Sequence, residues 1–129
     1  MKYWKLGCNW GAGTPDFYEL LRKRRIVICA AADMSKGDWV LICHGFRCDA
    51  LAHISSEPIA CTSRPELKEE FRRFEIDYED WNLIADYDEF YELNEDEKFL
   101  YQLRQGICQV QNADVIENIE KIIRKKGNP

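Results

Sequence analysis

Four side chains of types that commonly bind metal lie within a stretch of eleven residues: Cys43, His44, Cys48 and His53. Zinc sites need ligands that converge on one point, usually through a closely spaced pair of cysteines. Cys43 and Cys48 flank a predicted hairpin turn and can approach each other, but the two histidines fall on strand positions that face differently. The chain contains no Cys-x-x-Cys. The pattern therefore favours two core cysteines and two ordinary histidines over a zinc site, and we expect no metal.

A cysteine nucleophile, Cys8 or Cys43, would need a base in contact and surroundings that lower the pKa of its thiol. The sequence shows neither, and it has no Walker A motif and no Gly-x-Gly-x-x-Gly motif for a nucleotide cofactor. Residues 66–97 carry fourteen acidic and three basic side chains. Such a density is more typical of a solvated or partner-binding face than of a catalytic pair. We therefore expect no catalytic residue and no cofactor.

The aromatic residue with the clearest binding chemistry is Trp10, which lies between Asn9 and the segment Gly11-Ala12-Gly13. Glycines let backbone approach a ligand, an asparagine amide both donates and accepts hydrogen bonds, and an indole offers a flat stacking face. This combination suits a planar base. The alternative is that Trp10 packs as a lid over the end of the fold.

The element that must position these residues is a predicted hairpin within residues 36–58. Strand 39–44 has apolar residues on both faces, Gly45-Phe46-Arg47 turns the chain, and residues 48–54 return as a second strand. A strand that is apolar on both faces must be covered on both. We therefore place it centrally in a small closed sheet.

The rest of the pattern predicts strands over 3–10, 26–31, 81–93 and 107–110, and helices over 15–24 and 65–74, from Asn94 to Gly106, and after Asn112. The order β-α-β-β-β-α-β-α-β-α indicates an α+β fold: a small mixed β-barrel of five or six strands flanked by three or four helices. The length of 129 residues predicts a single domain over 1–129.

The composition of the chain argues against a disordered protein and against a membrane-spanning one. A hydrophobic content of 46% argues against disorder, and no run approaches the about 18 apolar residues of a membrane span. The first eleven residues lack a signal-peptide core, so we expect a cytoplasmic protein with reduced cysteines. The net charge of −5 is unfavourable for nucleic-acid binding, but the acid is concentrated in residues 66–97 and both flanking parts are mildly basic.

Several short motifs, in their order along the chain, resemble the EVE-like domains of the PUA/ASCH/YTH superfamily. Residues 37–40 (Gly-Asp-Trp-Val) are similar to the family's Gly-Asp-x-Val turn, residues 50–58 to its Ile-x-Gly-Ile strand, and residues 104–110 to its closing Arg-Gln segment. Residues 9–13 are similar to the start of EVE-like specificity domains in modification-dependent restriction enzymes. The chain lacks the stretch rich in Gly, Arg and Asn that follows the first helix in bacterial EVE proteins.

The resemblance implies a PUA-like, EVE-like barrel that recognises nucleic acid, with a modified base flipped into an aromatic pocket at the barrel mouth. It also implies DNA or RNA carrying a modified base as the partner, and a separate motor or nuclease subunit as a further candidate. Carried over onto this chain, the base-binding residues would be Asn9, Trp10 and Gly11, with Trp39 as the pocket wall and Arg104 and Gln105 on phosphate or the base edge.

Two other functions stay open. Some ASCH relatives are hydrolases that act on modified nucleosides or RNA, but the sequence brings no set of carboxylate, lysine and threonine together. A protein-interaction domain could instead dock a basic partner through the acidic residues 66–97. We favour a binding module over an enzyme.

Overall fold

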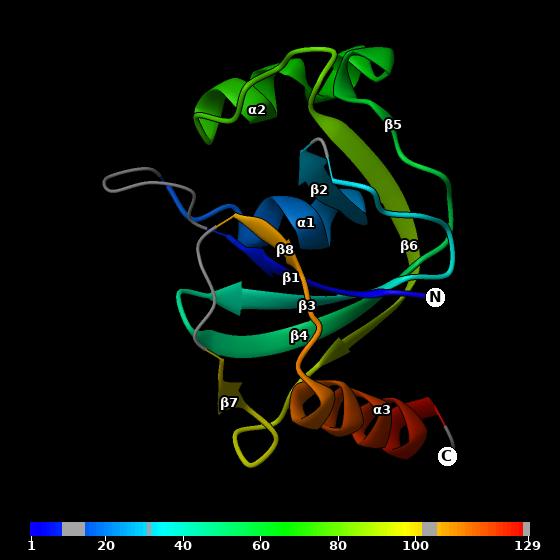
Figure 1. The fold of residues 1–129 in the computed structure, drawn as a ribbon. Helices are drawn as coiled ribbons and strands as arrows, with labels where there is room; N and C mark the ends of the chain where they lie inside the picture. Colours follow the sequence, from blue (N-terminus) through cyan, green and yellow to red (C-terminus); the bar gives the residue numbers. More distant parts are fainter. Residues whose placement is uncertain (9–14, 31, 102–105, 128–129) are drawn as a thin grey trace.

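The structure is a computed structural model that describes residues 1–8, 15–30, 32–101 and 106–127 (Figure 1). Its main feature is a mixed sheet that curls into a nearly closed barrel. Along the sheet the strands follow the order β2-β6-β4-β3-β1-β8, and the short strands β5 and β7 pair with β6 and β4. Neighbouring strands are antiparallel except β1 and β3. The strands are β1 (Tyr3–Gly7), β2 (Ile26–Ala30), β3 (Trp39–His44), β4 (Arg47–Ile54), β5 (Ile59–Ala60), β6 (Leu83–Glu92), β7 (Phe99–Leu100) and β8 (Ile107–Gln109).

Helices cover the barrel from two sides: α1 (Tyr18–Arg24), α2 (Lys68–Arg73) and α3 (Ala113–Gly127), with 3₁₀ turns η1 (Cys61–Ser63) and η2 (Pro65–Leu67) before α2. The last helix starts where its cap predicts. Asn112 Oδ1 accepts hydrogen bonds from the backbone N–H groups of Asp114 and Val115, at 2.9 and 3.2 Å. The α+β class and the small mixed barrel with flanking helices are thereby confirmed.

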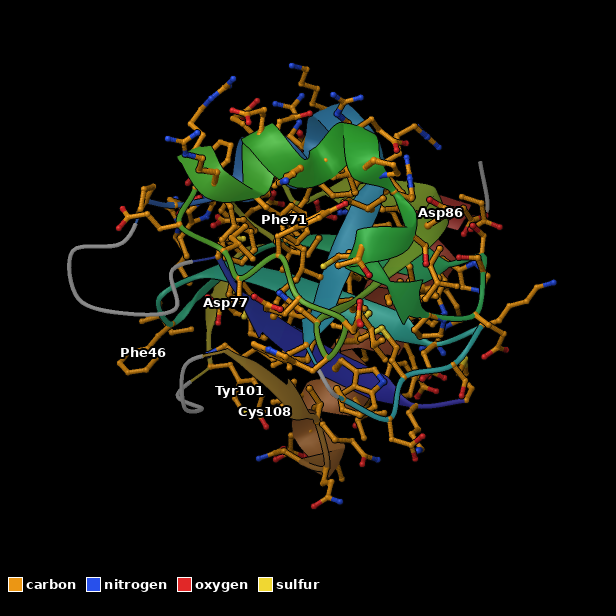
Figure 2. All side chains as sticks on the ribbon, turned by 90° about the horizontal axis from the view of Figure 1, so that it is seen from above. Phe46, Phe71, Asp77, Asp86, Tyr101 and Cys108 are labelled. Carbon is orange, nitrogen blue, oxygen red and sulfur yellow. The ribbon has the colours of Figure 1, made fainter. Side chains whose placement is uncertain are left out.

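The two faces of β3 belong to different cores. Val40 and Ile42 pack into a cluster with α1 and α2, whereas Leu41 and Cys43 pack into a second cluster beneath α3. Figure 2 shows Phe71 reaching from α2 toward the first of these. The prediction that this strand is central and covered on both faces is confirmed, because β3 lies between β4 and β1.

The prediction of a helix starting at Asn94 is wrong. Residues 95–97 form a turn, and Phe99 and Leu100 form β7, which pairs with the start of β4. The capping contact itself is present, since Glu97 Oε1 accepts a hydrogen bond from the backbone N–H of Asn94 at 2.8 Å. Pairing with β4 gives this segment backbone partners that no local pattern reveals. Among the described residues, no helix has the length and apolar character needed to cross a membrane.

Candidate functional site

The predicted base-binding residues Asn9, Trp10, Gly11, Arg104 and Gln105 lie outside the described residues. The described residues that flank them meet at one end of the barrel. The backbone N–H of Cys8 donates to the carbonyl of Cys43 at 3.0 Å, and the N–H of Phe17 donates back to the carbonyl of Cys8 at 3.0 Å. Cys8 and Phe17, the described residues on either side of this stretch, therefore lie beside the end of β3.

The second flank lies at the same end. The backbone N–H of Tyr101 donates to the carbonyl of Phe46 at 2.8 Å, and that of Gly7 donates to the carbonyl of Gly106 at 2.9 Å. We call this end of the barrel, formed by residues 7–8, 43–49, 101 and 106, the mouth. Both stretches that carry the predicted base-binding residues, except Trp39, are attached to it.

Trp39 lies at the opposite end of β3, about 17 Å from His44 at the strand's usual rise per residue. Its indole is buried beneath α3, where it stacks on Tyr91 with ring centroids 5.8 Å apart and packs at a tilt against His53 at 4.8 Å. A separate hollow of about 200 Å³ lies beside it, lined by Met1, Tyr3, Trp39, Glu120, Ile123 and Arg124. The structure does not bring Trp39 to the mouth.

A β-bulge places a carboxylate in the mouth. In the β3–β4 hairpin Ile42 pairs with Ala50 and Cys43 pairs with Cys48, so Asp49 is an extra residue without a partner on β3. Bulges redirect side chains and recur next to functional sites. Asp49 is also buried, with 6% of its side chain exposed. A buried carboxylate needs partners to offset the loss of hydration.

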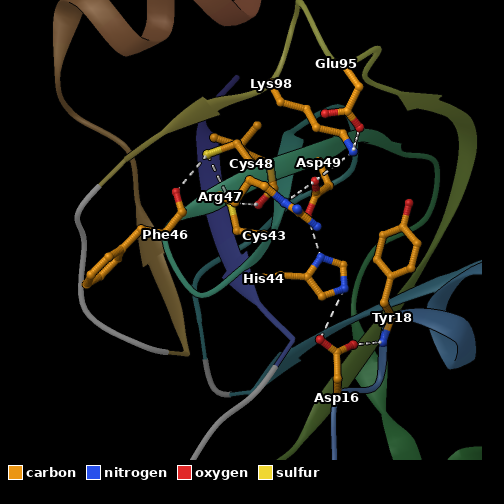
Figure 3. Close-up of polar contacts among 11 residues, drawn as sticks. Asp16, Tyr18, Cys43, His44, Phe46, Arg47, Cys48, Asp49, Glu95 and Lys98 are labelled. Atoms are coloured by element: carbon orange, nitrogen blue, oxygen red, sulfur yellow. Dashed lines mark hydrogen bonds and ion pairs between the residues drawn. The ribbon is translucent and has the colours of Figure 1, made fainter.

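The first partner of Asp49 is His44, at the end of β3. Asp49 Oδ2 lies 2.5 Å from Nδ1 of His44, and Asp16 Oδ2 lies 3.1 Å from Nε2 on the other side of the ring (Figure 3). The imidazole is thus held between two carboxylates. A neutral imidazole can donate to only one of the two carboxylates, from the nitrogen that carries its proton, and only the protonated ring can donate to both at once.

Two cations approach the other oxygen of the same carboxylate. Arg47 Nε lies 2.9 Å and Lys98 Nζ lies 3.4 Å from Asp49 Oδ1. These are charge contacts, since Oδ1 accepts no hydrogen bond from the described part of the chain. A hydrogen bond with Glu95 raises the pKa of Lys98, so this ammonium stays charged. The negative charge of the buried Asp49 carboxylate is therefore faced by two cations on Oδ1 and by His44 on Oδ2.

Tyr18 and Arg22, both from α1, complete the site. The Tyr18 ring packs against His44 with centroids 4.9 Å apart, and its backbone N–H donates to Asp16 Oδ1 at 2.9 Å. Burial, and then the nearby Glu92 carboxylate, raise the pKa of the Tyr18 phenol, which therefore stays a neutral donor. Arg22 Nε binds Glu92 Oε1 at 2.9 Å. Together these side chains enclose a hollow of about 270 Å³, lined by Tyr18, Arg22, His44, Arg47, Asp49, Glu92, Leu93 and Lys98.

Cys8, whose carbonyl accepts from Phe17 beside this site, is fully buried. Burial raises its pKa, and the negative charges of Asp16 and Asp49 raise it further. A protonated thiol is a poor nucleophile, so the arrangement does not favour thiolate chemistry. Among the described residues, no group of three or more His, Cys, Asp or Glu side chains is placed to hold a metal ion.

The acidic residues 66–97 do not form one uniform surface. Several of their carboxylates contact a cation: Glu70 binds Arg24, Asp86 binds Arg64 and Glu92 binds Arg22. Glu97 binds Lys126 at 3.0 Å. Much of the negative charge is therefore offset by partners from other parts of the chain.

Sequence reasoning did not single out His44 with Asp49 as a functional pair. Both residues belong to the predicted hairpin, and their proximity to a turn was visible. Their contact depends on the bulge, which shifts the register by one residue.

Comparison of the chain with protein-family models, with curated proteins and with solved structures found no match.

Proposed function

We propose that this chain is a PUA-like, EVE-like nucleic-acid-binding module that takes one modified base of DNA or RNA into the hollow at the mouth. One observation carries the proposal. An aromatic and polar hollow, built around His44 and Asp49, lies at the barrel end to which residues 9–14 and 102–105 are attached. The resemblance of those residues to base-binding motifs and the position of the hollow are independent of each other.

The size and lining of the hollow suit a single heterocycle. Pockets for drug-sized ligands measure about 300–1,000 Å³, and the hollow of about 270 Å³ falls just below this range. Tyr18 and His44 supply ring faces for stacking. Asp49 and Glu92, which line the hollow, are carboxylates that can accept from an exocyclic amino group, as carboxylates do from the cytosine amine.

The rim cations suit a contact with the sugar–phosphate backbone that is weak by itself. Arg22, Arg47 and Lys98 each have an acidic partner within 3.4 Å. A phosphate must therefore compete with that partner, and little free energy is left for binding without regard to sequence. Affinity should come from the base in the hollow, in keeping with the net charge of −5.

The test is binding of the purified chain to short oligonucleotides that differ only in one modified base, measured by fluorescence anisotropy at two salt concentrations. We expect a preference for one modification, reduced at least about tenfold in His44→Gln, since one strong polar contact is worth about 1.4 kcal/mol or more. Trp10→Ala and Asn9→Ala should reduce it as well.

The matched control is His53→Gln. His53 also contacts an aspartate, Asp88 at 2.7 Å, but its strand position faces α3 and Trp39. This variant should bind like the parent protein. Equal affinity for every modified oligonucleotide, or equal losses in the two histidine variants, would reject the proposal.

A hydrolase acting on modified nucleosides or RNA is the second candidate, and the contact between Asp49 and His44 favours it. A buried carboxylate on Nδ1 orients an imidazole so that Nε2 can exchange a proton with a substrate that displaces its present contact with Asp16, at 3.1 Å. The test is turnover of an acylated cytidine or cleavage of RNA by the pure protein, lost in His44→Gln and kept in His53→Gln. Binding without turnover would leave the first proposal as the function.

A further inference from the structure

We propose that Cys43 and Cys48 form a reversible disulfide, so that the hairpin beneath the mouth carries an oxidative modification site. The inference does not rest on the proposed function, because it concerns the thiols themselves. Both cysteines are fully buried and reduced in the structure.

The backbone already holds the pair in a geometry that a disulfide can adopt. Cys43 of β3 and Cys48 of β4 are directly opposed in the antiparallel register. Opposed residues of an antiparallel pair have Cα atoms about 4.5–5.5 Å apart, within the range of about 4.4–6.8 Å for disulfides. The Cys43 thiol donates to Cys48 Sγ at 3.2 Å (Figure 3). Bond formation requires the sulfurs to approach by about 1.2 Å more, to the usual length of about 2.05 Å.

A buried ammonium lies near the pair. Lys5 is 2% exposed, and its Nζ donates to the carbonyl of Tyr101 at 2.7 Å between the rings of Phe46 and Tyr101, at 5.4 and 5.6 Å. Burial raises the pKa of the Cys43 thiol, and the charge of Lys5 acts in the opposite direction. Burial and the hydrogen bond with Cys48 outweigh the charge of Lys5 and keep the pKa of the Cys43 thiol raised, so the thiolate that must attack an oxidant is scarce and the attack is slow.

The route for a small oxidant is the tip of the hairpin. Gly45 has φ of 59°, and Phe46, which follows it, is 49% exposed and projects from the edge of the molecule (Figure 2). The carbonyl of Phe46 is 3.9 Å from Cys48 Sγ. A displacement of this two-residue tip breaks the hydrogen bond from the Tyr101 N–H to the Phe46 carbonyl and moves that carbonyl away from Cys48 Sγ, so we expect a small oxidant to reach the pair from this side.

The oxidant that we name is a small hydroperoxide. One thiolate attacks the O–O bond, which breaks: its sulfur is oxidised to a sulfenic acid, and the peroxide is reduced and leaves as alcohol or water after taking up a proton. The second thiol then attacks the sulfenic sulfur. The S–S bond forms, the S–O bond breaks, and water leaves with the thiol proton. Two electrons pass from the two sulfurs to the peroxide.

We expect the disulfide to change the geometry of the mouth, because each cysteine immediately precedes a residue of the polar site. His44 follows Cys43 and Asp49 follows Cys48, on either side of the bulge. Drawing the sulfurs together changes the spacing of the two strands at this point. The contact between His44 Nδ1 and Asp49 Oδ2, at 2.5 Å, must adjust.

The experiment uses the purified full chain, fully reduced and then exposed to excess hydrogen peroxide. Remaining thiols are alkylated in denaturant, and the peptides are mapped by mass spectrometry. We expect a mass lower by two hydrogen atoms, a Cys43–Cys48 cross-link, and full reversal by dithiothreitol. Cys48→Ser should lose the cross-link, and Cys61→Ser, which removes another buried cysteine, should keep it.

Two results would overturn the inference. One is oxidation of Cys108, the only cysteine of the six that is partly exposed, while Cys43 and Cys48 are recovered as free thiols; this readout uses the parent protein and does not depend on a variant folding. The other is an unchanged mouth. The chain has only two histidines, so ring-proton NMR distinguishes them: the His44 signals should shift on oxidation and those of His53 should not.

Discussion

The mouth of the barrel and the face covered by α3 use the same residue types in different surroundings. Each has a histidine that contacts an aspartate and packs at a tilt against an aromatic ring: His44 with Asp49 and Tyr18, and His53 with Asp88 and Trp39. Asp49 has 6% of its side chain exposed and draws in Arg47 and Lys98, whereas Asp88 is 55% exposed and is hydrated. Burial of the carboxylate, rather than the pairing itself, separates a polar site from a surface contact.

The largest expected effect is a loss of stability on the face covered by α3. Trp39 is buried against Tyr91 and His53, so Trp39→Ala should lower the free energy of unfolding by about 3–5 kcal/mol, the usual cost of removing a buried aromatic ring. Urea denaturation measures the loss. Base binding by the folded variant should be unchanged, because the ring lies at the far end of β3. A loss of binding with unchanged stability would place the functional site beneath α3 instead.

The next effect compares the two aspartates directly. Asp49→Asn removes the charge that three partners face, and we expect a loss of about 2–3 kcal/mol in the free energy of unfolding, somewhat below that for breaking a fully buried ion pair. Asp88→Asn removes one exposed contact and should cost at most about 1 kcal/mol. Urea denaturation of both variants at neutral pH tests the difference. Equal losses would show that burial of Asp49 has no energetic consequence.

A further effect is a pH dependence at Glu97, where the loop before β7 meets the end of α3. The hydrogen bond from the backbone of Asn94, and then Lys126 and Lys125, lower the pKa of Glu97 from 4.5 to about 2. The ionised group therefore contributes stability that is complete above its ordinary pKa and is lost as the pH falls toward 2.

In Glu97→Gln the decline in stability between neutral pH and pH 3 should be shallower than in the parent protein, as followed by urea midpoints. Glu95→Gln is the control, because the Glu95 side chain is 91% exposed. A decline identical in all three proteins would mean that the contacts of Glu97 do not contribute.

The local sequence pattern was sufficient to predict an element whose structure depends mainly on its own residues. The apolar residues on both faces of β3 predicted a central strand, and the Asn112 cap with the isoleucines that follow it predicted α3. Both signals depend on neighbours within a few residues. The segment after Asn94 carries an equally good cap signal, yet it forms a turn and β7, because Phe99 and Leu100 pair with β4.

From the sequence alone, the strand–helix order, the central hairpin and the approach of Cys43 to Cys48 across its turn could be inferred, since each follows from periodicity or from distance along the chain. The position of His44 between Asp49 and Asp16 was decided only by the tertiary structure. It requires the bulge that inserts Asp49 and the start of α1 that brings Asp16 alongside. Such contacts join elements whose registers are set by the packing of the whole barrel, and that packing leaves no trace in the spacing of residues along the chain.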